Sequence, residues 1–150
     1  MIATSVAYDV VFLVHVMAAV ATLTVLVAMR WSAQLVVRGA DGATQQARFP
    51  ARRNWAARVI HLMPITGLVL VASGGSSVSF AHAWVGVGLL LYLAAAGHLE
   101  ARTLPLERSM TQIIRRDGAA TPQMGATLVR SVDALLLLVA LALVVMLVQF

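Results

Sequence analysis

Long uncharged apolar runs alternate along the chain with shorter segments that carry most of its charged residues. A helix of about 20 mainly apolar residues crosses the ~30 Å hydrocarbon core of a bilayer. The first run, 10–29, has this length and ends at Arg30 and Trp31. The second run, 59–99, is longer than one such helix, and its serines and glycines at 73–77 predict a turn that divides it. The pattern predicts four transmembrane helices at about 10–30, 55–73, 82–102 and 128–150.

The composition indicates that lipid surrounds these helices. Hydrophobic residues make up 61% of the 150-residue chain and charged residues 11%, whereas soluble domains average about 25% charged residues. A globule of this size leaves roughly a third of its chain surface exposed, so it could not bury so many apolar side chains. We therefore predict an all-α fold: a single integral membrane domain over 1–150, with the four transmembrane helices in an antiparallel bundle.

The arginines predict the orientation of the bundle. All eleven basic residues counted in the net charge are arginine, and they lie within 30–58 and 102–130. Cytoplasmic loops of membrane proteins carry an excess of Lys and Arg. Both arginine-rich regions are therefore expected in the cytoplasm, with the N and C termini outside, in the bacterial cytoplasmic membrane. Anionic headgroups of the lipid bilayer are the expected partners of these arginines. Nucleic acid is not, because the chain has no basic recognition helix with aromatic residues.

Within the arginine-rich regions, the breaker residues at 39–42 and 117–122 are interpreted as flexible connectors. The segment Leu106–Arg116 is predicted to form a short amphipathic helix that lies on the membrane surface. The residues expected to face lipid are Leu106, Met110, Ile113 and Ile114.

Ionisable residues inside the predicted spans are candidate functional residues, because such groups are costly in lipid. They are His15, His61, His98, Glu100 and Asp133, with His82 at the outer end of the third span. Counted from the arginines at the helix ends, His61, His98 and Asp133 share a layer about 5 Å inside the cytoplasmic boundary. Two histidines on neighbouring helices can ligate heme b, and Asp133 could orient one imidazole. The alternative is structural: the three residues reach the interface, and Asp133 pairs with Arg130 on its own helix.

His15 lies farther from the cytoplasmic boundary, about 22 Å from Arg30. Its face of the helix also carries small residues that are typical of helix–helix contacts in membranes, Ala18, Ala19 and Thr22. His15 is a candidate heme ligand, with Met146 or His82 as the second ligand. The alternative is a hydrogen bond from His15 to a neighbouring helix.

Several site types are excluded or disfavoured. His82 and His98 are sixteen residues apart, so they lie about 160° apart around the third helix and do not suit two stacked hemes. The chain has no cysteine, which excludes thiolate metal sites and disulfides. No hydrolase or nucleotide-binding motif is present, so we assign no catalytic residues.

Three stretches carry a resemblance to known families: VHVMAAVATLT at 14–24, LMPITGLVLVASGG at 62–75 and WVGVGLLLYLAAAGHLEARTLPLERSM at 84–110. With them the chain resembles uncharacterised bacterial families of predicted integral membrane proteins. These are similar to the copper-resistance D membrane domain and to HemJ-type protoporphyrinogen oxidases. Resemblance to the HemJ type implies that His15 is a heme ligand. The chain lacks that family's Trp-Gly in the first helix and has no lysine, so the oxidase activity is not carried over.

Three functions fit the sequence. The preferred hypothesis is a non-catalytic accessory or assembly subunit of a larger membrane complex, with structural histidines. Partner membrane subunits would then cover the fourth helix and the small residues of the third. The alternative is a redox-linked membrane protein that binds heme b through His15, His61, His98 or Met146. The third is copper handling or transport with histidine and methionine ligands.

Overall fold

The computed structural model describes residues 2–49, 51, 54–73 and 81–148, and in these ranges it is helical with no β-strand. The helices are α1 (Ile2–Val37), α2 (Gly42–Arg48), α3 (Leu62–Ser73), α4 (Ala83–His98), α5 (Leu104–Asp117) and α6 (Pro122–Val148). A 3₁₀ segment, Ala56–His61, leads into α3, and a π-helical turn, Leu99–Thr103, joins α4 to α5.

Four helical segments are long and apolar enough to cross a membrane: Val6–Val37, Ala56–Ser73, Ala83–Asp117 and Pro122–Val148. They correspond in order to the four predicted transmembrane helices, so the all-α class and the four apolar helices are confirmed. Two of the segments continue well past their predicted ends, α1 to Val37 and α4 through the π-turn into α5. Most of the predicted turn at 73–77 lies outside the described residues.

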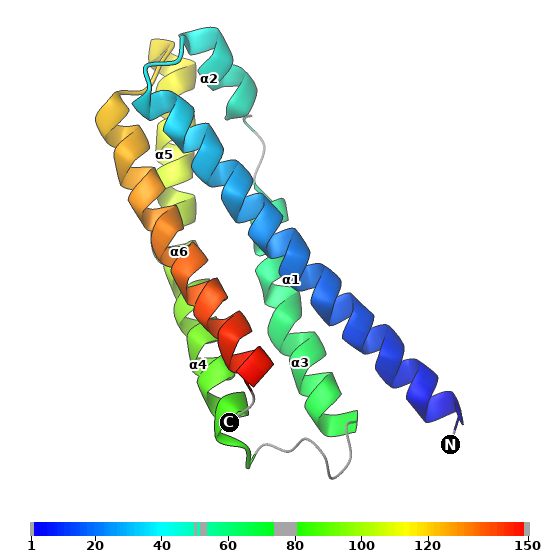
Figure 1. Ribbon diagram of the computed structural model, residues 1–150. Helices are drawn as coiled ribbons and strands as arrows, with labels where there is room; N and C mark the ends of the chain where they lie inside the picture. The colour runs from blue at the N-terminus through cyan, green and yellow to red at the C-terminus, as the bar shows by residue number, and fades with distance from the viewer. Residues whose placement is uncertain (1, 50, 52–53, 74–80, 149–150) are drawn as a thin grey trace.

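The four apolar segments pack side by side, but not equally closely. α1 packs along α6, α4 packs on the other side of α6, and α3 packs on α1, whereas α3 and α4 make few contacts. The start of α1, the end of α3, the start of α4 and the end of α6 lie at one end of the molecule (Figure 1). α1 and α6 are close together at the opposite end, and α1 diverges from α6 toward its N-terminus (Figure 1).

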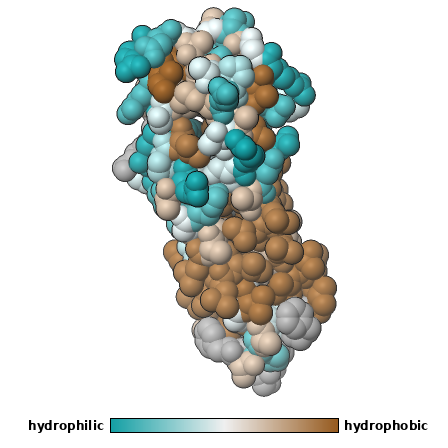
Figure 2. Space-filling view, turned by 90° about the vertical axis from the view of Figure 1, so that its left-hand side faces the viewer, coloured by the Kyte–Doolittle hydropathy of each residue, from teal (hydrophilic) through white to brown (hydrophobic). Residues whose placement is uncertain are grey.

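That opposite end is a folded unit, which we call the headpiece: α1 from Arg30 onward, α2, α5 and the first turns of α6. Its helices share a hydrophobic core that includes Val36, Phe49, Met110, Ile114 and Leu128, all of them buried. Figure 2 shows polar residues gathered over the headpiece, a broad apolar surface below it, and a small polar patch at the opposite end of this face. The breaker residues predicted as connectors do lie between helices, after Val37 and after Asp117, but the described helices on either side of them are packed against one another.

The helix predicted at Leu106–Arg116 is present as α5, but its predicted environment is wrong. Met110 and Ile114 are buried against protein, and Leu106 and Ile113 pack against the same core. The reason is that α5 continues α4 along the axis of the molecule and contacts α2 and α6. It does not lie across the apolar surface.

Proline explains the π-turn between α4 and α5. Pro105 has no N–H, and its ring would clash with the carbonyl four residues earlier in an α-helix. The backbone accommodates this by widening, and the Leu104 N–H donates to the Leu99 carbonyl, five residues back. Such turns change the angular spacing of the residues around them and are frequent at functional sites.

The headpiece turns are closed by glycines and by one buried amide. Gly39 ends α1 at φ 77° and Gly118 ends α5 at φ 89°, in the left-handed region that glycine adopts without strain. The side chain of Gln45 is buried between the two turns. Its Nε2 donates to the Ala40 carbonyl at 2.8 Å, and its Oε1 accepts from the Ala120 N–H at 2.8 Å. Gln45 thus ties α2 to the α5–α6 connection.

Candidate functional site

The polar residues singled out in the apolar helices do not meet at one centre. Each one contacts a different neighbouring helix, and together these contacts link the four apolar segments in a ring.

His15 links α1 to α3. Its Nδ1 lies 2.7 Å from the hydroxyl oxygen of Thr66. That hydroxyl donates its own proton to the Leu62 carbonyl at 2.7 Å, so its oxygen accepts from His15 Nδ1–H. The lone pair of the imidazole is then on Nε2. The ring lies beside Gly67, where an added Cβ would be 3.5 Å from His15 Cε1.

His61 links the 3₁₀ segment before α3 to α4 and the π-turn. Its Nδ1 lies 2.9 Å from the Tyr92 hydroxyl, and its Nε2 lies 3.4 Å from Oε1 of Glu100. Arg58 donates to both oxygens of the same carboxylate, at 2.8 and 2.9 Å. The Arg58 guanidinium also lies over the Trp55 ring, 5.1 Å from its centroid. This cluster of Arg58, His61, Tyr92 and Glu100 is the densest polar contact among the described residues of the apolar segments.

His98 links α4 to α6, on the face opposite the one that His61 approaches. Its Nε2–H donates to the Ser131 carbonyl at 3.1 Å and lies 3.0 Å from the Ser131 hydroxyl. Thr103, from the π-turn, lies 2.8 Å from the same hydroxyl. Residues two positions apart on a helix point to nearly opposite sides. His98 and Glu100 therefore face different helices, and His61 contacts Glu100 instead of His98.

Asp133 links α6 to α1. Arg30 Nε donates to Asp133 Oδ1 at 2.6 Å, and both side chains are 44% exposed. The structural alternative for Asp133 predicted an ion pair with Arg130 on the same helix. That prediction is wrong, because the partner of Asp133 is Arg30. The close packing of α1 on α6 brings Arg30 to the carboxylate, and the ion pair joins two helices instead of bracing one.

Met146 and His82 lie on the α4 side of the molecule. The methyl group of Met146 would be 2.9 Å from a Cβ added to Gly88, so Met146 packs over that glycine. His82 is exposed immediately before α4, with its ring 6.3 Å from the Trp84 ring. His15, by contrast, makes its hydrogen bond to α3. Ligation of heme by these residues remains a prediction.

Sequence reasoning identified the histidines and Asp133 but missed most of their partners. Thr66, Tyr92 and Ser131 are common residues in apolar helices, and Arg58 was interpreted only as a marker of topology. Glu100 was the exception, because it was itself one of the ionisable residues singled out in the predicted spans. Among the described residues, no group of three or more His, Asp or Glu side chains is arranged to hold a metal ion.

No family model, curated protein or solved structure matches the chain. The resemblance to the bacterial membrane families therefore remains a prediction. Function is inferred below from the chain's own residues.

Proposed function

We propose that the chain is an integral membrane protein whose four apolar segments cross the bacterial cytoplasmic membrane as an antiparallel bundle. The headpiece lies in the cytoplasm and both termini lie outside. Large apolar side chains on the outer surface support this proposal, for example Leu13, Leu90 and Leu137, each at least 60% exposed. Such side chains require lipid or protein around them. The arginines of the headpiece support the orientation.

Single cysteines test this topology, because the chain has none of its own. Gln46→Cys in α2 and Ala81→Cys before α4 replace exposed residues. In intact cells an impermeant thiol reagent is expected to label only Ala81→Cys, and Gln46→Cys is labelled after permeabilisation. Labelling of Gln46→Cys alone in intact cells would reverse the orientation.

Within the membrane, we propose that the chain is a non-catalytic accessory or assembly subunit of a larger complex. The observation that carries this is the distribution of the histidines: His15, His61 and His98 each contact a different neighbouring helix. Catalytic groups have to converge within about 3 Å of a reacting atom. Hydrogen bonds between membrane helices instead contribute about 0.6 kcal/mol each and set how the helices pair. These histidines suit the second role.

The outer face of α4 supports a membrane partner. Gly86, Ala94 and Gly97 are exposed there, one to three helical turns apart, and added Cβ atoms at the two glycines would have no neighbour within 4 Å. Small residues at this spacing let a second helix approach closely. This is the face of the third predicted helix that the sequence assigned to a partner subunit.

A pull-down in mild detergent tests the accessory role. Tagged protein is expected to recover other membrane subunits in fixed stoichiometry. Gly86→Leu is expected to weaken this recovery, because it adds bulk on the outer face without a neighbour in the chain itself. Leu13→Ala, on an exposed position of α1, is the control for a change of apolar surface. Recovery of a monomer or homodimer alone would contradict the proposal.

One observation favours heme b binding as a second candidate function. Thr66 accepts from Nδ1 of His15, which leaves Nε2 as the nitrogen available to a ligand. Histidines that bind metals are commonly oriented in this way through their other nitrogen. Purified protein would then be red, with narrow visible bands on reduction that His15→Ala removes and His98→Ala keeps. Colourless protein from heme-sufficient cells would contradict this function.

A further inference from the structure

A cavity of about 740 Å³ lies where the headpiece meets the apolar segments, between α1, α5 and the described residues Phe49, Ala51 and Asn54. This volume is within the range of small-molecule sites in proteins, about 300–1,000 Å³. The cavity has two chemically different ends. Its apolar end is formed by Val25, Ala28 and Met29 of α1 together with Leu128 of α6. Its polar end is formed by residues of α5 together with Arg48 and Asn54.

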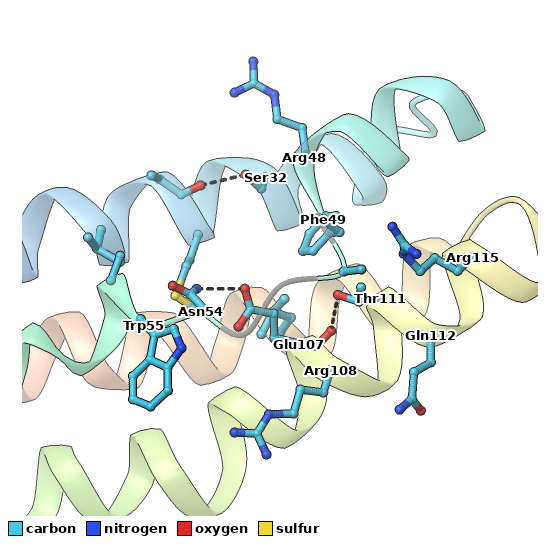
Figure 3. A pocket seen from close by; sticks show the side chains of 16 residues that line it. Ser32, Arg48, Phe49, Asn54, Trp55, Glu107, Arg108, Thr111, Gln112 and Arg115 are labelled. Carbon is cyan, nitrogen blue, oxygen red and sulfur yellow. Dashed lines mark hydrogen bonds between the residues drawn. The ribbon is translucent and has the colours of Figure 1, made fainter.

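The polar end carries an excess of positive charge. Of the residues that the structure describes, three arginines line it, Arg48, Arg108 and Arg115, together with one acidic residue, Glu107. Glu107 already accepts a hydrogen bond from Asn54 at 2.9 Å. Figure 3 shows Glu107 and Asn54 pointing toward each other, Arg108 on the side of Trp55, and Arg48 and Arg115 on the side of Phe49. The side chains of these arginines are exposed and available to an anion, and those of Arg48 and Arg108 extend in opposite directions (Figure 3).

The apolar and polar ends of the cavity lie one after the other along the direction in which the helices would cross a bilayer. The apolar end belongs to the last turns of α1 before Arg30, and the polar end belongs to the headpiece. Trp55 lines the cavity and is 64% exposed, and Trp31 is exposed at the end of the same apolar stretch of α1. Tryptophans are enriched at the membrane–water interface. The cavity therefore lies where acyl chains give way to headgroups.

We propose that this cavity binds the phosphate-bearing headgroup of an anionic membrane phospholipid. The arginines pair with the phosphate, because guanidinium groups bind phosphate through paired hydrogen bonds. The glycerol and the first acyl carbons contact the apolar end. Basic pockets on the cytoplasmic side of membrane helices bind lipid headgroups in this way. The inference rests on the proposed membrane insertion and orientation, but not on the accessory role. A soluble phosphate could form the same hydrogen bonds with the arginines, but the apolar end of the cavity would then remain exposed to water.

Lipid titration into detergent-purified protein tests the site, with the melting temperature as the readout. Short-chain phosphatidylglycerol is expected to stabilise the wild-type protein, and phosphatidylcholine is expected to stabilise it much less. Arg108→Gln and Arg115→Gln are expected to weaken apparent affinity for phosphatidylglycerol about tenfold or more each, since hydrogen bonds to charged groups are the stronger class. Arg116→Gln is the matched control: it is on the same helix, exposed, paired with Asp117 and outside the cavity.

Two further arms separate lipid from free phosphate. Ala28→Leu adds bulk at the apolar end and is expected to weaken lipid binding. Inorganic phosphate alone is expected to give little stabilisation. Full stabilisation by inorganic phosphate, equal stabilisation by phosphatidylcholine, or an equal loss in Arg116→Gln would each overturn the proposal. The labelling and pull-down experiments do not depend on this cavity, so their failure is distinguishable from failure of lipid binding.

Discussion

Replacing Ile114 with alanine tests whether α5 packs on protein, as the structure has it, or on lipid. Ile114 is fully buried, at 0% exposure, in the headpiece core beside Met110. The substitution removes three carbons, and burial contributes about 0.8 kcal/mol per methylene. The cavity left behind adds to that loss, so the unfolding free energy is expected to fall by about 2–5 kcal/mol. The loss should be in the upper part of this range, because packed helices surround the site.

Ile113→Ala is the matched control, because it makes the same chemical change one position along α5. Ile113 is only partly buried at the edge of the core. Its loss is expected to be well below that of Ile114. Unfolding in detergent, followed by helical circular dichroism, measures both values. If α5 lay on the membrane with both isoleucines facing lipid, the two variants would lose similar stability. Equal losses would refute the headpiece core.

Three more predictions concern the contacts that hold the helices together. Gly125→Leu should destabilise the protein by about 1–3 kcal/mol, because an added Cβ would be 3.0 Å from backbone atoms of α1; Gly97→Leu, with open space around it, should not. A double-mutant cycle of Arg30→Gln and Asp133→Asn should give a coupling energy of about 0.2–1 kcal/mol, and a value near zero would remove the ion pair as a stabilising contact. Asp41 caps α2, and hydrogen bonds from the first turn of that helix hold its pKa below the ordinary value of 3.8. The stabilisation of α2 by ionised Asp41 is therefore fully present above pH 3.8, and it is lost as the pH falls through the lower pKa of the folded state. Hydrogen exchange of the α2 amides should rise in acid in the wild type and much less in Asp41→Asn.

The candidate residues illustrate how far sequence reasoning reached. His15, His61, His98 and Asp133 were selected because polar groups in apolar helices are costly, and all four make contacts between helices. Their depth in the membrane could be predicted by counting residues along each helix. Their partners could not be predicted, because a partner depends on which helices are neighbours and how each helix is rotated. Arg30 reaches Asp133 only because α1 packs along α6.

The apolar helices and the headpiece differ in the same way in how far the sequence predicts them. The sequence by itself determined the four apolar helices, because a helix satisfies its own backbone hydrogen bonds and the length of each apolar run is a local property. It also determined that the arginines lie at one end. Only the tertiary structure decided that this end is a packed headpiece with a cavity. The apolar face of α5 suits lipid and protein equally well, and the continuation of α4 through the turn before Pro105 is what directs that face onto protein.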